Sequence, residues 1–380
     1  MTDAAYISGV GMTRFGKHPR RNIEDLAREA LTKALSDAGI ERRDVDEVFC
    51  GSSFGGTLIG QRILRDVGMT GIAITNVENA CSSGATALRE ANAAIAQQRA
   101  RTILVIAVDQ LSRLGGGTLP LESTDLEVNV GMVMPALYAM RARRYMHETR
   151  ATCEHLAAIA VKAHRAGALN PYAQFQNRVT LDEVLASRMV SDPLTLYMCC
   201  PTGDGAAAAV VTNEKKARAS GQKPIRIAAS TLQSGLYKTG FRDMATSELT
   251  MRTSRLAYEA AGLGPEDVDF AEVHDAFAIA ELMYYEALGF CGKGQGSELV
   301  ERGDTALCGA KPVNPSGGLL CRGHPVGATG LAQVSEAVWQ LRGQANKRQV
   351  EGARVGLTHC TGGGISGVDH GACTVHILIA

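Results

Sequence analysis

Three loops of the sequence carry residue types that can react with a carbonyl compound. Cys81 lies among small residues, and His324 lies in a glycine-dense segment. Cys360 comes two residues before Gly362 in a third glycine-rich stretch. A thiolate can attack a carbonyl carbon, and an imidazole can accept the thiol proton or donate to an oxyanion. These residue types predict covalent catalysis in which Cys81 is the nucleophile and His324 is the base.

The surroundings of Cys81 resemble a turn from a strand into a helix. Free N–H groups and the helix dipole favour an anion at such a position, so we expect this thiol to ionise more readily than an isolated cysteine. The alternative is a buried structural cysteine, because free cysteine is among the most buried residue types.

Two further residues follow predicted strands. A thiol at Cys360 beside glycine N–H groups can shuttle a proton next to an oxyanion pocket. The rival interpretation, a phosphate-binding glycine loop, lacks the residue pattern of either common phosphate motif. His274 in the segment His274-Asp275-Ala276-Phe277 also ends a predicted strand, and its alternative is a structural histidine at the surface.

An internal duplication organises the elements that must position these residues. Residues 39–50 match residues 262–273 at an offset of 223, each copy following a predicted helix and ending in a predicted strand. The six residues from Cys81 match the six from His324 at an offset of 243. Both six-residue segments precede an alanine-rich helix and then a strand. The cysteine and the histidine are therefore expected at equivalent helix starts in one cavity.

Residues 116–194 have no counterpart in the duplication. Their helical patterns predict an inserted loop subdomain beside the site, after which a strand at 206–212 closes the first half. We expect an N-terminal half at 1–220 and a C-terminal half at 221–380.

Composition restricts the class of protein. The 380 residues include 39 basic and 39 acidic side chains, so a globally basic surface for nucleic acid or anionic membrane is excluded. No apolar run approaches the ~20 residues of a membrane helix, and no secretion signal begins the chain. The ten cysteines form no CxxC pair, so we expect neither a disulfide framework nor a metal site. A cytoplasmic α/β enzyme is the resulting prediction.

Together these motifs resemble the thiolase superfamily of acyl-CoA C-acyltransferases across essentially the whole chain. Cys81 matches the nucleophile motif, and Gly323-His324-Pro325 with 327–330 matches the histidine motif. The segment 360–363 is similar to the second-cysteine motif. The resemblance implies a duplicated five-layer αβαβα fold with an inserted loop domain, a homodimer or larger assembly, and coenzyme A as co-substrate without a permanently bound cofactor.

One departure identifies a branch of the family. Many thiolases carry Asn-Glu-Ala-Phe where this chain has His274-Asp275-Ala276-Phe277, and the histidine version resembles the sterol-carrier-protein-type thiolases. Those enzymes often place a cysteine where Ala276 stands and lose the C-terminal one. Because Cys360 is present, the expected proton shuttle is that of ordinary thiolases.

The resemblance also implies residue roles. Cys81 would attack the 3-keto carbon of a 3-oxoacyl-CoA while His324 accepts its proton, and Cys360 would protonate the leaving enolate and then deprotonate incoming CoA. His324 with a water held by His274 would form one oxyanion hole. The N–H groups of Cys81 and Gly362 would form the other. The reverse reaction is a Claisen condensation, and either direction belongs to lipid metabolism or degradation.

Three other functions remain open. A ketoacyl synthase uses two histidines, which the presence of Cys360 disfavours. A retro-aldolase of the superfamily would be a lyase that needs no nucleophilic Cys81. A non-catalytic lipid-binding subunit would need none of these residues. Some histidine-type thiolases resemble chains that work with a small zinc-ribbon and OB-fold partner, and such a partner is a further hypothesis.

Overall fold

The computed structural model describes the chain except residues 1–2, 116, 122–124, 237–241 and 364–370. Nine strands of the described chain form one hydrogen-bonded order, β3-β2-β4-β7-β1-β8-β11-β10-β9. Their bounds are β1 Ala5–Met12, β2 Glu47–Gly51, β3 Ala73–Val77, β4 Thr102–Gln110, β7 Asp204–Asn213, β8 Ile225–Ser234, β9 Phe270–Glu272, β10 Val355–Gly362 and β11 Ala372–Ile379.

The strand order repeats the duplication. In the first half β3 and β4 run parallel to β2, whereas β7 and β1 follow antiparallel. In the second half β9 pairs parallel with β10, and β11 and β8 follow antiparallel. The second half has a parallel bridge between Ala271 and Val313 at the position that corresponds to β3 of the first half. Within the described residues, the two half-sheets are joined by two residue pairs of β1 and β8, Tyr6 with Arg226 and Ile7 with Ile225.

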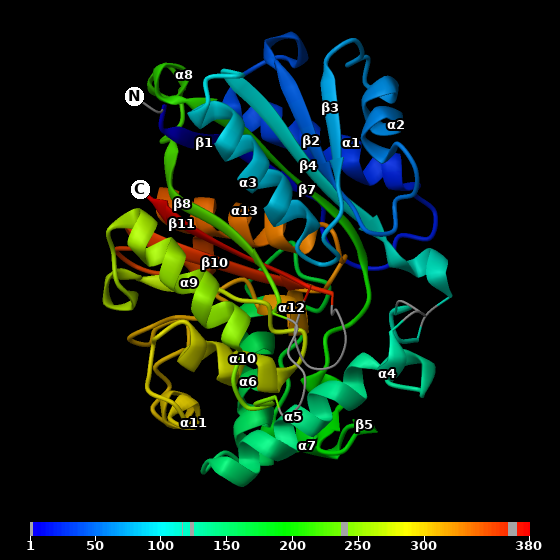
Figure 1. The fold of residues 1–380 in the computed structure, drawn as a ribbon, viewed down its shortest axis with the longest axis vertical. Coiled ribbons are helices and arrows are strands. Elements are labelled where there is room, and N and C mark those ends of the chain that lie inside the picture. The colour runs from blue at the N-terminus through cyan, green and yellow to red at the C-terminus, as the bar shows by residue number, and fades with distance from the viewer. Residues whose placement is uncertain (1–2, 116, 122–124, 237–241, 364–370) are drawn as a thin grey trace.

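Helices cover both faces of each half-sheet. Helix α1 (Ile23–Ala38) packs on β1 and β7, and α9 (Glu248–Ala261) packs on β8 and β11. Helices α3 (Ser83–Ala96) and α13 (Thr329–Arg342) contact the half-sheets and each other. This arrangement gives the expected five layers, with α3 and α13 in the middle. Figure 1 places β2, β3 and β4, coloured blue to cyan, above the C-terminal strands β10 and β11, coloured red.

Strand β4 contains an uninterrupted apolar run because both of its faces are buried. Alternate side chains join two different cores, because successive residues of a strand point to opposite faces. Leu104, Ile106 and Val108 pack with α1. Ile103 and Val105, with Ala107, pack with α3 and α13. The strand is therefore buried on both sides.

The inserted segment forms a helical layer at the bottom of Figure 1. It contains α4 Leu126–Asn129, α5 Met134–Glu148, α6 Cys153–Gly167, α7 Leu181–Ala186 and a hairpin of β5 Met189–Ser191 and β6 Leu194–Thr195. Helix α6 packs against α10 (Ala278–Ala287) and α12 (Gly318–Arg322), which flank the expected site. Gly116, at the expected start of the insertion, lies outside the described residues. The remaining helices are α2 Ile59–Asp66, α8 Glu214–Arg218 and α11 Gly296–Glu301.

The first sequence match is visible as two equivalent helix ends. Helix α1 ends at Gly39 with φ of 66°, and α9 ends at Gly262 with φ of 68°, the left-handed conformation that glycine adopts without strain. A one-turn 3₁₀ helix follows each, at Arg42–Asp44 and Pro265–Asp267.

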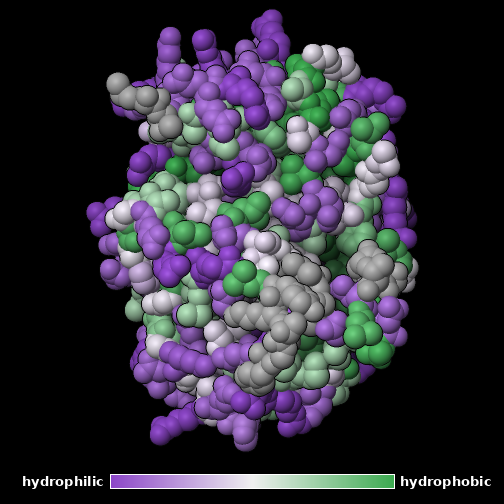
Figure 2. Space-filling model, viewed as in Figure 1, coloured by the Kyte–Doolittle hydropathy of each residue, from purple (hydrophilic) through white to green (hydrophobic). Residues whose placement is uncertain are grey.

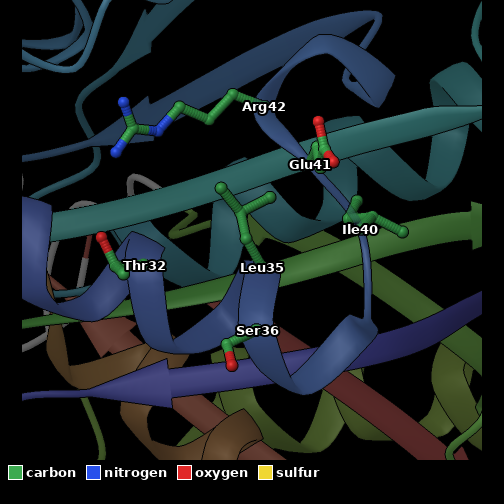
Figure 3. Close-up of a pocket in the computed structure, with 6 residues that line it drawn as sticks. All are labelled: Thr32, Leu35, Ser36, Ile40, Glu41 and Arg42. Carbon is green, nitrogen blue, oxygen red and sulfur yellow. The ribbon is translucent and has the colours of Figure 1, made fainter.

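Each of these helix ends borders a surface hollow. The first, of about 380 Å³, is drawn in Figure 3 and is lined by Thr32, Leu35, Ser36, Ile40, Glu41 and Arg42. The second, of about 440 Å³, includes the residues 223 positions after five of them: Arg255, Tyr258, Glu259, Leu263 and Pro265. Neither hollow is lined by a predicted site residue. They are products of the duplicated scaffold.

The second sequence match is a close approach of two helix starts. The Gly84 N–H donates to the Gly327 carbonyl over 3.0 Å. A Cβ on Gly84 would lie 2.7 Å from that oxygen and 2.7 Å from the Ala107 methyl. A Cβ on Gly330 would lie 2.6 Å from that of Ala85. Glycine is needed here because only a hydrogen atom fits between α3 and α13.

The Gly84→Val variant should therefore be destabilised. The added atoms collide with backbone, and overpacking of this kind lowers the free energy of unfolding by ~1–3 kcal/mol or more. Urea unfolding followed by circular dichroism measures the loss. Gly221→Ala is the matched control, because nothing lies within 4 Å of its added Cβ. Equal unfolding midpoints for both variants would contradict the close approach of the helices.

Candidate active site

Cys81 is held in a strained turn between β3 and α3. Ala80 before it has φ of 47°, in the left-handed region. Ser83 stabilises this turn, since its hydroxyl accepts the Asn79 N–H over 2.9 Å and donates to the Ala80 carbonyl over 2.6 Å. The Cys81 side chain is half-buried at the start of the helix. Serine at position 83 is therefore a structural part of the nucleophile loop.

His324 lies between two helices and has a defined tautomer. Its Nδ1 lies 2.6 Å from the Thr329 hydroxyl, which itself donates to the Pro325 carbonyl over 2.9 Å. A hydroxyl has one hydrogen, so this pattern assigns the imidazole proton to Nδ1. The lone pair of Nε2 is then available to accept a proton. The short helix α12 before His324 was not predicted, because its glycines indicated an irregular loop.

His274 follows β9 and contacts the second thiol. Its Nδ1 lies 3.4 Å from the Cys360 sulfur, and its ring stands edge-on to that of His324 with centroids 5.2 Å apart. The His274 backbone N–H is 3.5 Å from Nδ1 of the fully buried His359. His274 is 3% exposed, so the alternative of a surface histidine is wrong.

Cys360 lies within β10 rather than after it. Its thiol donates to the carbonyl of Cys81 over 3.1 Å, which places the second thiol directly beside the nucleophile loop. Because the Cys360 thiol donates its one hydrogen to the Cys81 carbonyl, the Cys360 sulfur accepts a hydrogen bond from Nδ1–H of His274. Nε2 of His274 then carries no proton and can act as an acceptor. Cys360 is 1% exposed.

The structure brings these residues into one cluster. The Cys81 sulfur, one ring nitrogen of His274 and one of His324 all lie within 4.8 Å of one another. A separation of this size allows proton transfer through one bridging water. Three loops that are more than 40 residues apart in the sequence thus meet at one point.

The protonation state of the nucleophile differs from the sequence expectation. Burial raises the pKa of the Cys81 thiol to about 12, although a backbone hydrogen bond from Gly363 lowers it and so opposes this effect. The expectation of a readily ionised thiol was wrong, because loss of hydration outweighs the N–H groups at the helix start. Burial also raises the pKa of Cys360, and the neighbouring Cys81 adds to this effect.

His324 is held neutral. Burial, together with the smaller effect of the Arg322 charge, lowers its pKa to about 3. A neutral imidazole beside a neutral thiol can act as a base only when the thiol proton moves as the sulfur forms a bond. The site is therefore arranged for concerted proton transfer.

The glycines after Cys360 lie against the nucleophile loop. A Cβ on Gly362 would be 2.2 Å from the Asn79 carbonyl and 3.1 Å from the Cys81 nitrogen, so only glycine fits. Backbone hydrogen bonds from Gly363 and from Cys81 itself lower the pKa of the Cys81 thiol. Gly363 was not among the residues expected from the sequence, which pointed to Gly362.

The buried Asp109, which was not expected from the sequence, joins the loop after β2 to the histidine loop. Asp109 at the end of β4 accepts hydrogen bonds from the Ser52 hydroxyl over 2.7 Å and from the Phe54 N–H over 2.8 Å. It also accepts the Gly327 N–H in the histidine loop over 2.5 Å. The only sequence signal was an acidic residue at the end of an apolar strand.

A second missed carboxylate fixes the His274 loop. Asp275 accepts the N–H of Leu319 over 2.7 Å at the start of α12. Asn314 accepts the Val273 N–H over 2.8 Å and donates to Glu281 over 2.8 Å. The loops that carry His274 and His324 are therefore joined by polar groups that are themselves buried.

The chain belongs to the thiolase family. Residues 5–215 match the model of the thiolase N-terminal domain, and residues 235–372 match that of the thiolase C-terminal domain-like family. The expected thiolase fold is confirmed.

Three known proteins illustrate the similarity. The chain is 43% identical to the benzoylsuccinyl-CoA thiolase subunit BbsB of Thauera aromatica over 377 residues, covering 97% of this chain and 98% of that one. It is 42% identical to human sterol carrier protein 2, covering 94% of this chain and 69% of that protein. The solved structure of the Ltp2-ChsH2(DUF35) aldolase superposes with a TM-score of 0.86 at 27% identity, covering 99% of this chain and 98% of that one.

The likeness to sterol carrier protein 2 confirms the resemblance to the sterol-carrier-protein branch. The chain is also 41% identical to an acetyl-CoA acetyltransferase of Methanothermobacter thermautotrophicus, covering 100% of both chains, which supports an acyltransferase. Among the described residues, no helix has both the length and the apolar character to cross a membrane.

The Thr329→Val variant tests the tautomer of His324. Without the hydroxyl, nothing fixes the proton on Nδ1, so alkylation of Cys81 by iodoacetamide and turnover should slow roughly tenfold or more. Thr329→Ser keeps the hydroxyl and should recover most of the rate. A merely structural role for Thr329 would lower the melting temperature of the valine variant without changing its alkylation rate.

Proposed function

We propose that the protein is a thiolase that cleaves a 3-oxoacyl-CoA with CoA, or runs the reverse Claisen condensation, through an acyl-enzyme on Cys81. The observation that carries this proposal is the cluster of Cys81, His274 and His324 within 4.8 Å. The thiol of Cys360 at 3.4 Å from His274 adds the second acid and base that two half-reactions require.

The first half-reaction begins with attack of the Cys81 sulfur on the 3-keto carbon. The lone pair of His324 Nε2 accepts the thiol proton as the bond forms, because neither group is charged beforehand. The bond between the second and third carbons of the acyl chain then breaks. The shortened acyl group stays on Cys81, and an enolate of the CoA thioester leaves.

The proton that His324 has accepted can then be donated in a hydrogen bond to the enolate. Once Nε2 has taken the proton from Cys81, it is a donor, and it can stabilise the enolate oxygen at the moment when charge develops there. A water held by His274 completes this oxyanion hole. The N–H groups of Cys81 and Gly362, with that of Gly363 nearby, stabilise the tetrahedral species on the acyl side.

Cys360 serves both half-reactions. Its thiol protonates the enolate carbon and releases the CoA thioester made of the first two carbons of the chain. The resulting thiolate takes the proton of an incoming CoA, whose sulfur attacks the acyl group on Cys81. The shortened acyl group leaves as its CoA thioester, and Cys81 takes back the proton held by His324, which regenerates the enzyme. CoA is a co-substrate in this scheme, and no resident cofactor or metal takes part. The activity would belong to cytoplasmic lipid metabolism or degradation.

A retro-aldolase is the second candidate, and the likeness to the solved aldolase structure favours it. Such a lyase cleaves the carbon–carbon bond without an acyl-enzyme, so Cys81 would be dispensable. A non-catalytic lipid-binding subunit would need neither Cys81 nor Cys360. The juxtaposition of both thiols with two imidazoles favours the thiolase.

We also propose that the chain assembles as a homodimer or larger oligomer. Strand β3 is an edge of the sheet, and Ala73, Thr75 and Asn76 on it are exposed. Around α4, Leu126 and Val130 are 73% and 78% exposed. Figure 2 shows apolar atoms, coloured green, at the position of α4 in an otherwise largely polar face. An open strand edge and exposed apolar side chains are typical of association surfaces.

A small partner with a zinc ribbon and an OB-like fold is a further proposal. The name of the Ltp2-ChsH2(DUF35) aldolase pairs two components and marks the second as a DUF35 protein. BbsB is likewise named as a subunit. Two relatives whose names imply a second component support the proposal that this chain also works with a partner.

CoA-dependent cleavage of a panel of 3-oxoacyl-CoAs tests the thiolase directly. We expect at least one to be cleaved, and mass spectrometry after incubation with acyl-CoA but no free CoA should find the acyl group on Cys81. The Cys81→Ser variant should lose both. Cys308→Ser, which changes an exposed thiol elsewhere, is the control.

Two results would overturn this assignment. An acyl group found on Cys360 would reverse the roles of the thiols. Cleavage of a 3-hydroxyacyl-CoA that persists in Cys81→Ser would instead identify the retro-aldolase.

The His274→Ala variant tests the enolate oxyanion hole. Loss of the group that holds the water should slow cleavage ~10²-fold or more, since removal of one oxyanion donor typically has that effect. Alkylation of Cys81 should remain largely intact, and His274→Asn should recover part of the activity. Steady-state rates, alkylation rates and thermal melts distinguish this catalytic role of His274 from a structural role. If the role were structural, His274→Ala would lower the melting temperature and reduce cleavage and alkylation equally.

A further inference from the structure

The three side chains that would perform the chemistry also have the composition of a metal site. Cys81 supplies a sulfur, and His274 and His324 supply imidazole nitrogens, the ligands that zinc and other thiophilic cations prefer. Within the described residues, this is a group of potential ligands whose donor atoms lie within 4.8 Å of one another. The sequence predicted no metal site, because these ligands are 193 and 50 residues apart and form no recognisable spacing.

We propose that the cluster of Cys81, His274 and His324 binds Zn²⁺ reversibly and that the bound ion blocks the nucleophile. The ion would have three protein ligands and one open position, the arrangement of tetrahedral zinc sites that retain a water.

The geometry needs only small movements. A point equidistant from three atoms that are 4.8 Å apart lies ~2.8 Å from each, whereas zinc bonds to nitrogen and sulfur measure ~2.0–2.3 Å. Each ligand atom must therefore move by less than ~1 Å. Rotation of the half-buried Cys81 side chain can supply the movement of the sulfur.

The hydrogen bonds beside the cluster use the Nδ1 atoms of both rings. Thr329 accepts the Nδ1 proton of His324 over 2.6 Å, and the Cys360 sulfur faces Nδ1 of His274 over 3.4 Å. Both imidazoles therefore present an unprotonated Nε2. Such second partners also fix the ring orientation, as they do in established metal sites.

Charge favours a single thiolate ligand. On binding, the Cys81 thiol gives its proton to solvent, and the thiolate neutralises half of the ion's charge. The buried Arg322 precedes His324 by two residues, and Glu272 forms an ion pair with Arg322 over 3.0 Å. Binding of the cation is therefore opposed less than a lone arginine would oppose it.

The test uses the full-length protein with Co²⁺ as a spectroscopic probe and Zn²⁺ as its competitor. We expect one equivalent of Co²⁺ with tetrahedral visible bands and a sulfur-to-cobalt charge-transfer band, both lost on addition of Zn²⁺. Cys81→Ser should abolish the charge-transfer band. His274→Ala and His324→Ala should each weaken affinity by ~100-fold or more, since loss of even an outer-shell partner typically has a 10–100-fold effect.

Cys308→Ser is the thiol control and should keep the charge-transfer band at unchanged affinity, whereas Cys360→Ala should keep the band with weaker affinity, because it removes the sulfur beside His274 Nδ1. A band that survives in Cys81→Ser and disappears in Cys308→Ser would overturn the proposal, as would the absence of any cobalt–sulfur band in a wild-type protein whose melting curve shows it folded. Circular dichroism of each variant separates loss of a ligand from loss of the fold.

The inhibitory effect rests on the proposed thiolase activity, whereas the spectroscopic result does not. Zn²⁺ should suppress cleavage and acylation of Cys81, and a chelator should restore both. Metal binding without any thiolysis would leave the site established and refute the thiolase. Thiolysis that is unaffected by saturating Zn²⁺ would refute the inhibitory role.

Discussion

The catalytic geometry depends on the contact between two helix starts at the centre of the molecule. Gly84 and Gly327 approach through a 3.0 Å hydrogen bond, and Gly330 lies against Ala85 so closely that no Cβ fits. Asp109 holds one side of this contact by accepting N–H groups from both halves. The relative position of the nucleophile and the base is therefore set by backbone atoms, which move less than side chains do.

Burial determines the protonation states of Cys81 and His324, which matter for the reaction as much as the distance between them. A thiol with a pKa of about 12 and an imidazole with a pKa of about 3 form a neutral pair at any physiological pH. A neutral thiol resists alkylation and oxidation better than a thiolate, since the thiolate is the reactive form. The Cys81 thiol therefore loses its proton only when a carbonyl carbon is positioned to form a bond with the sulfur.

The sequence predicted the framework and the reacting groups but not the polar supports. The repeated apolar helices and strands, with offsets of 223 and 243, were sufficient to predict two equivalent halves and to bring Cys81 and His324 together. Asp109, Asp275 and Asn314 were missed, because a single acidic or amide residue gives no periodic signal and its role depends on backbone groups far away in the sequence. The Cys81 protonation state was missed for a related reason: burial is a property of the whole fold.

The mirrored strand order also constrains how such a site can arise. Two identical copies of one half would place the same residue at both central helix starts, so a symmetric pair would hold two thiols or two imidazoles. In one polypeptide the two positions are encoded separately, so each can carry a different residue. The asymmetry between Cys81 and His324 is possible for this reason, while Gly84 and Gly327, which occupy equivalent positions in the two motifs, keep the two helix starts in contact.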